Sequence, residues 1–285
     1  MMSEKKKLNG KKILKIVLAI IGVIGVLFTI YFGFKKPKIH EDSITAIVDR
    51  MKSDQQQDLS ESLSEEIRTV AERMTNPKTA DDFYLIGYAA YNVEDHATAI
   101  AYFQKAVQLN SKFEMAYNMI GLSYRSIGKQ DEAIEAYRKA IKINPEFALA
   151  YYNMGNAFSQ KGEWEAATQS FSRAIQFNLS KRYTFDAYRI MGASYLALGK
   201  SDEAIQSLLK AIELKPDDAH VHNTIAVAYS FSGKFDEMFK SYRKALELEP
   251  DNASTYNNMG NAYKAIGDQT RADEYFQKAN ELKKK

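Results

Sequence analysis

The amino-acid sequence predicts an all-α protein: a solenoid of stacked helical hairpins that follows a single N-terminal transmembrane helix. Two observations carry this prediction. From residue 80 onward, small residues recur with a period of 34 residues, which is typical of helical-hairpin solenoids. Near the N-terminus, an uncharged apolar run of 19 residues has the length of a helix that crosses a bilayer.

The N-terminal segments are interpreted as a basic cytoplasmic tail, residues 1–15, and a transmembrane helix, residues 16–34. As a helix, the apolar run is roughly 28 Å long, close to the hydrocarbon thickness of a bilayer. Six lysines precede the run and three follow it, so the positive-inside rule places the N-terminus in the cytoplasm. We therefore expect a single-pass protein of a bacterial inner membrane, with its repeats on the periplasmic or extracellular side.

Three small residues share one face of the predicted transmembrane helix, because Gly25, Thr29 and Gly33 are spaced four apart. This spacing permits close pairing of two helices in lipid, and therefore a weak homodimer, which the linker helices would also allow. Glycine and threonine are common in membrane helices, which favours the simpler interpretation without a dimer.

The linker, residues 35–79, is expected to contain two short amphipathic helices. Apolar residues at helical spacing mark both, the first at Ile44, Ile47, Val48 and Met51, the second at Leu59, Leu63, Ile67, Val70 and Met74. We expect the second helix to cover the apolar end of the first repeat, because a terminal repeat needs a cap. A short coiled-coil dimer is the alternative.

The remaining chain, 80–285, divides into six units. Small residues at one position and alanine at two others mark the units, with a three-residue slip after the third unit. The fifth unit is the exception at one of the alanine positions, where it has Met238. The units are 80–113, 114–147, 148–181, 185–218, 219–252 and 253–285.

Each unit is interpreted as two helices joined at a turn. In the second unit, Tyr117, Gly121 and Tyr124 share one face of the first helix, and Gly128 turns the chain. The pattern resembles the tetratricopeptide repeat (TPR) family, and the third unit fills its expected positions with Tyr151, Met154, Gly155, Phe158, Gly162, Ala167, Phe171 and Ala174. The resemblance implies a right-handed solenoid. The extra residues 182–184 are interpreted as a longer connection between units.

The resemblance also implies a function, since the first helices of TPR units line a concave groove that holds a peptide or a partner helix. The groove positions are aromatic and apolar in the first units and rich in asparagine in the last units, and both residue classes suit recognition of a peptide. The candidate residues are Tyr84, Leu85, Tyr88, Tyr91, Met119, Leu122, Tyr152, Asn153, Asn156, Asn223, Asn257, Asn258 and Asn261.

Three alternatives stay open. In the first, a linker helix of the chain itself fills the apolar half of the groove, since an exposed apolar patch commonly has a cover. The protein is alternatively a constitutive accessory subunit of a membrane-bound enzyme or secretion complex, or an adaptor similar to import receptors with cytosolic repeats. The clamp with which related proteins hold chaperone tails is not expected, because three consecutive units do not supply its residues.

Composition argues against several other functions. The first 38 residues carry nine lysines and one glutamate, which leaves a net charge of −5 for the rest of a chain whose total is +3. An acidic repeat region argues against a nucleic-acid partner. The chain has no cysteine and no phosphate loop or nucleophile elbow. We therefore expect no enzymatic activity, no cofactor and no metal site.

Overall fold

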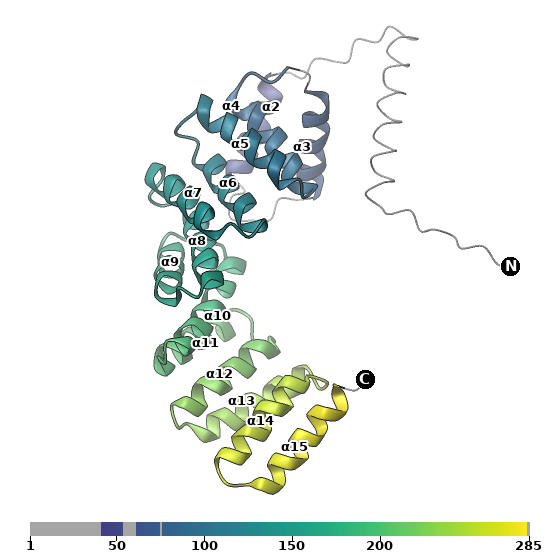
Figure 1. Cartoon of the computed structure of the whole chain (residues 1–285), viewed down its shortest axis with the longest axis vertical. Coiled ribbons are helices and arrows are strands. Elements are labelled where there is room, and N and C mark those ends of the chain that lie inside the picture. Colours follow the sequence, from purple (N-terminus) through teal and green to yellow (C-terminus); the bar gives the residue numbers. More distant parts are fainter. Residues whose placement is uncertain (1–40, 54–60, 75, 284–285) are drawn as a thin grey trace, which may run out of the picture. The chain divides into compact units, whose positions relative to one another are not determined.

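The computed structural model describes residues 41–53, 61–74 and 76–283, and within these residues the protein is all-α, with fourteen helices and no strand (Figure 1). The chain divides into two units, Met1–Ser43 and Ile44–Lys285. Only the last three residues of the first unit are described, so the fold below is that of the second.

Two short helices precede the repeats: α2, Glu41–Ser53, and α3, Glu61–Arg73. An ion pair ties them together, with Arg50 Nη1 2.7 Å from Glu66 Oε2, and α3 contacts the first helix of the repeats. The apolar face of α2 is almost wholly buried, at Ile44, Ile47, Val48 and Met51.

Six helical hairpins follow in chain order. Within each unit the two helices pack along their length, and the second helix contacts the first helix of the next unit. First helices of successive units also contact each other, whereas second helices of successive units are not packed together in this way within the described chain. The first helices therefore form the inner row of the stack. The pairs are α4 (Ala80–Asn92) with α5 (His96–Leu109), α6 (Glu114–Ser126) with α7 (Gln130–Ile143), α8 (Ala148–Lys161) with α9 (Trp164–Gln176), α10 (Lys181–Ala197) with α11 (Ser201–Leu214), α12 (Ala219–Phe231) with α13 (Phe235–Leu248), and α14 (Ala253–Ala265) with α15 (Gln269–Leu282).

The recurring glycine of the first helix has a packing cause. A large side chain of the second helix lies directly over it, as Phe103 lies over Gly87 and Phe171 over Gly155. A Cβ added at Gly155 would be 2.9 Å from the Phe171 ring. The two helices cross so closely that this position has no room for a methyl group in five of the six units.

The three extra residues of the fourth unit lengthen a helix and not a connection, contrary to our interpretation of the sequence. Helix α10 begins at Lys181 and has 17 residues, whereas the other first helices have 13 or 14. The Thr184 hydroxyl donates to the carbonyl oxygens of Leu179 and Ser180 at 2.8 and 2.9 Å. The added turn moves Tyr183 against Tyr152 of α8, with ring centroids 4.9 Å apart.

A left-handed residue closes the turn inside every hairpin. Five units use glycine there, with φ between 69° and 85°, but the first unit uses Glu94, with φ 61°. Side chains with a Cβ adopt this conformation at a cost of about 1 kcal/mol relative to glycine.

We expect Glu94→Gly to raise the free energy of unfolding by about 0.5 kcal/mol, because part of the relieved strain is offset by the greater freedom of glycine in the unfolded chain. Denaturant unfolding of the full chain, followed by circular dichroism, measures this. The matched control is Gly128→Ala in the next unit, where a Cβ would meet no atom within 4 Å. Stability should fall there, and a Glu94→Gly variant that is less stable than the parent would contradict the argument.

The predicted localisation is corrected. In the part of the chain that the structure describes, no helix combines the length and the apolarity that a membrane span requires. The segment 16–34 on which the prediction rested lies outside the described residues, as do the basic tail 1–15 and the pairing face at Gly25, Thr29 and Gly33. A single-pass inner-membrane protein with periplasmic or extracellular repeats is therefore not retained, and what stands is a TPR-like helical domain.

Candidate functional site

The candidate residues all lie on the first helices, but the structure separates them into buried and accessible sets. The first set is core: Tyr84 is 2% exposed and Leu85 is fully buried. The Tyr84 ring packs against Phe103 and Phe113, with centroids 5.5 and 4.9 Å apart, and burial raises its pKa well above the usual value. Met119, Tyr152 and Asn153 are buried as well.

Two candidates of the second and third units are neither fully buried nor exposed. Leu122 of α6 is half-buried and packs against the core of the third unit. Asn156 of α8 is also half-buried, and its side chain donates to the Tyr152 carbonyl oxygen of its own helix at 3.1 Å. Both therefore contribute to the solenoid itself and expose only part of their side chains in the inner row.

Three half-buried tyrosines lie at the inner row of the N-terminal half. Tyr88 and Tyr91 extend from α4 and are half-buried, as is Tyr183 of α10. Burial, with smaller contributions from Tyr91 and Tyr183, raises the pKa of Tyr88 to about 12. Tyr183 in turn packs on Tyr152. The added turn of α10 thus brings a tyrosine of the fourth unit close to those of the first, and the sequence reasoning missed Tyr183.

Asparagines link the first helices of neighbouring units in pairs. Asn153 donates to Asn118 at 3.0 Å, and Asn258 donates to Asn223 at 3.2 Å. The first pair is buried and joins α6 to α8, while the second is partly exposed and joins α12 to α14. These amides hold the stack together, which leaves each of them fewer free donors and acceptors for a ligand.

The inner row is open in the C-terminal half. Asn261 and Lys264 of α14, His220 of α12 and Ala193 of α10 are exposed, and Asn257 is half-buried. The side chains of Asn257 and Asn261 make no hydrogen bond to any residue that the structure describes. Because they lie one turn apart on α14, they present two complete amides on one face.

Charge in the inner row centres on two arginines. Arg189 of α10 pairs with Asp186 one turn earlier, at 3.2 Å. Arg125, in the last turn of α6, is half-buried, and it makes no ion pair within the described part of the chain. Arg125 lies close enough to the buried Tyr137 to oppose the rise in that hydroxyl's pKa, which burial causes. The Tyr137 hydroxyl has no hydrogen-bond partner among the described residues.

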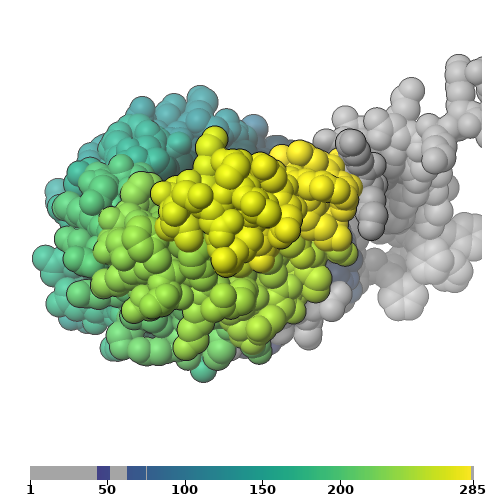
Figure 2. Space-filling view, turned by 90° about the horizontal axis from the view of Figure 1, so that it is seen from below, coloured from purple at the N-terminus to yellow at the C-terminus, as the bar shows by residue number. Residues whose placement is uncertain are grey.

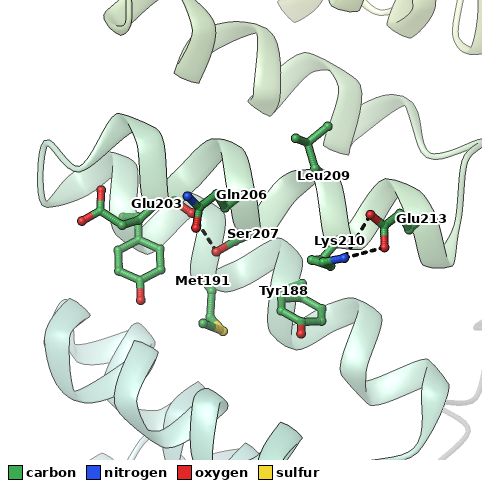
Figure 3. A pocket seen from close by; sticks show the side chains of 9 residues that line it. Tyr188, Met191, Glu203, Gln206, Ser207, Leu209, Lys210 and Glu213 are labelled. Carbon is green, nitrogen blue, oxygen red and sulfur yellow. Dashed lines mark hydrogen bonds and ion pairs between the residues drawn. The ribbon is translucent and has the colours of Figure 1, made fainter.

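Three hollows of similar size lie between helices elsewhere on the solenoid. The first, about 490 Å³, has Tyr188, Met191 and Tyr195 of α10 on one side and residues of α11 on the other (Figure 3). Its cation, Lys210, is engaged by Glu213 through contacts of 2.9 and 3.1 Å, drawn as dashed lines in Figure 3. A second hollow, about 540 Å³, lies at α8 and α9, where Arg173 donates to Gln176 at 3.0 Å. The third, about 520 Å³, lies between α13 and the α14–α15 hairpin.

No cluster of three or more His, Cys, Asp or Glu side chains able to hold a metal ion occurs in the described residues. The two histidines of α12 have separate environments, since a ring nitrogen of His222 lies 2.8 Å from the Pro216 carbonyl oxygen and His220 is exposed. The inner row therefore presents mainly tyrosine, arginine and asparagine side chains.

The comparison with protein families agrees with this architecture. Residues 49–285 match the model described as the cilia and flagella-associated protein 70 C-terminal domain, which is a TPR domain. The chain belongs to this family. No curated protein matches the chain. The TPR resemblance of the sequence is confirmed, and the repeats form a helical solenoid of the protein-interaction type.

Solved structures show the same fold. A crystal structure of MamA protein is similar to this chain, with 28% identity and a TM-score of 0.54 over 66% of this chain and 95% of that one. YrrB, described as a TPR protein with an unusual peptide-binding site, has 23% identity and a TM-score of 0.57 over 63% and 91%. MamA from Desulfovibrio magneticus RS-1 has 21% identity and a TM-score of 0.56 over 60% and 95%.

Proposed function

We propose that the TPR repeats bind an extended peptide segment of a protein partner along the inner row of first helices, in the C-terminal half formed by α10, α12 and α14. The observation that carries this proposal is the pair of unengaged amides, Asn257 and Asn261, beside the half-buried Asn223. An asparagine side chain both donates and accepts, so it can replace the hydrogen bonds that a peptide backbone makes with water. The repeats bind and do not catalyse, as the composition predicts.

The N-terminal half of the row has a different role in this proposal, in which α2 covers it. Two sets of buried side chains support the assignment. The apolar face of α2 is buried at Ile47 and Val48, and the inner-row residues Tyr84, Met115 and Tyr152 are buried as well. The positions equivalent to Tyr84 in the last two units, Asn223 and Asn257, are only half-buried. A linker helix over the apolar half of the groove was one of the alternatives from the sequence. With α2 in that place, a partner peptide binds at the asparagine-rich C-terminal half.

A selection from a random peptide library on the full-length chain tests the proposal. Peptides that bind should lose about thirtyfold in affinity when Asn257→Ala and Asn261→Ala are combined, since each amide contributes roughly one hydrogen bond of about 1 kcal/mol. Fluorescence anisotropy of the labelled peptides measures the affinity.

The control is Asn280→Ala, which removes an exposed amide from α15, away from the inner row. This variant should bind like the parent. If every selected peptide binds the double variant and the parent equally well, the inner row at α14 is not the peptide site.

A further inference from the structure

The third hollow, at the junction of the fifth and sixth units, differs from the other two in its surroundings. It is lined by Phe239, Tyr263 and Ile266, with Lys240, Arg243 and Arg271 among the polar residues, and we call it the α13 hollow. Asp236 and Glu237 also line it, but both lie in the first turn of α13, where the helix dipole favours negative charge. Figure 2 looks onto α14 and α15 at this end of the solenoid.

The hollow has a cause in the sequence. All five other units have alanine at the position that Met238 occupies. Met238 is buried, with 1% exposure, and the next residue, Phe239, stacks on Tyr263 of α14 with centroids 4.4 Å apart. Phe239 and Tyr263 form the aromatic floor of the hollow.

Large apolar side chains at the turns of the fifth and sixth units are exposed. Phe231 is 71% exposed and Phe235 is 46% exposed, and they flank the short turn between α12 and α13. Ile266, which lines the hollow directly, is 47% exposed. Single exposed apolar residues are ordinary, but Ile266 lines the hollow and Phe235 directly precedes the lining residue Asp236, which indicates a contact surface that extends from the hollow.

The lining of the hollow holds three cations and two carboxylates, and two of the cations are unengaged within the described chain. Arg271 lies over the Tyr263 ring, at 5.0 Å, and pairs with Asp268 at 2.8 Å. Lys240 and Arg243, one turn apart on α13, form no ion pair with the residues that the structure describes. By contrast, Lys210 and Arg173 in the other two hollows are bound by Glu213 and Gln176. Of these three hollows, the α13 hollow alone combines unengaged cations with exposed large apolar side chains.

We propose that the α13 hollow is a second docking site, separate from the inner row, for an acidic segment of a protein partner that carries a large apolar side chain. The apolar side chain contacts Phe239, Tyr263 and Ile266, which line the hollow. Carboxylates beside it pair with Lys240 and Arg243. Complementary charge of this kind gives such a contact its specificity and its sensitivity to salt.

The experiment uses the same random peptide library on the full-length chain, with two further variants. We expect a class of peptides in which aspartate or glutamate adjoins phenylalanine, leucine or methionine. Their affinity should fall about tenfold or more in the Lys240→Glu, Arg243→Glu double variant, as expected when attraction becomes repulsion. It should also fall in the Phe231→Ser, Phe235→Ser double variant and with rising salt.

Two controls distinguish binding in the α13 hollow from binding in the inner row and from a general effect of charge. Lys278→Glu reverses an exposed charge on α15 and should leave the affinity unchanged. The Asn257→Ala, Asn261→Ala variant should also leave it unchanged, so failure at either site is recognised independently. The proposal is overturned if no acidic-apolar class is selected or if the charge reversal has no effect. It is also overturned if sedimentation shows that the chain self-associates through Phe231 and Phe235.

Discussion

Phe171→Ala is expected to lower the free energy of unfolding by about 4 kcal/mol, which is the largest effect we expect from one side chain. Phe171 is fully buried in α9. Its ring lies over Gly155 and packs against Tyr152, with centroids 5.7 Å apart. Truncation would leave a cavity that the neighbouring helices cannot fill by moving closer, because their backbones already approach closely at Gly155.

The position in the array makes this loss more than local. The core around Phe171 runs from Tyr137 of the second unit to Met191 of the fourth. A solenoid is held together by contacts between neighbours only, so a defect in the third unit separates the units on its two sides. Denaturant unfolding should show a lower midpoint and a broader transition. The matched control is Phe231→Ala, an exposed phenylalanine whose loss should change stability by less than about 0.5 kcal/mol.

The period of the sequence was sufficient to predict the hairpins, because a close helix crossing demands a small residue at the same place in every unit. Gly87, Gly121 and Gly155 reveal that demand without any knowledge of the contacts. The period could not predict accessibility. Tyr84 and Tyr88 occupy neighbouring inner positions, yet Tyr84 is held between Phe103 and Phe113 while Tyr88 stays half-buried.

For the asparagines too, the repeat pattern predicted the position in the helix but not the contacts of the side chain. Asn153 and Asn258 have the spacing of groove residues, but both donate to an asparagine of the preceding unit. Such bonds depend on the offset between two helices, which one sequence period does not define. Tyr183 was missed because the slip of three residues was interpreted as a loop. Its spacing of four from Ala187, and of eight from Met191, was the available signal that the helix extends to it.

Irregularities in the repeat were more informative about candidate sites than the repeat itself. Met238 breaks the alanine pattern, and Phe239 stands where other units have isoleucine, threonine or aspartate. In the sequence, Met238 was an exception without a meaning. In the structure, both residues stand at the unit junction where an aromatic floor, Lys240 and Arg243 meet. A residue that departs from the repeat pattern changes the packing of its own unit. The surface of that unit then differs from the surfaces of the other units.

Gly121→Ala sets helix propensity against packing, and we expect packing to prevail. In an unconstrained helix the change from glycine to alanine stabilises by about 1 kcal/mol. Here the added Cβ would lie 2.7 Å from Tyr137 Cδ1 and 2.8 Å from Cζ. Tyr137 is fully buried, and its rigid ring cannot move aside without displacing α7. Overpacking of this kind costs about 3 kcal/mol, so the variant should be about 2 kcal/mol less stable than the parent.

The fifth unit has an alanine where Gly121 stands in the second unit. Ala226 occupies the glycine position there and has a tyrosine, Tyr242, at the same offset of 16 residues. In that unit Met238 replaces the alanine of the other units and is buried in one cluster with Ala226 and Tyr242, and we expect it to hold the two helices further apart. Gly121→Ala alone should therefore destabilise, whereas combining it with Ala133→Met, the residue of the fifth unit, should recover part of the loss. Unfolding of the single and double variants by denaturant decides this. If Gly121→Ala alone is as stable as the parent, the two helices of the second hairpin are already as far apart as those of the fifth.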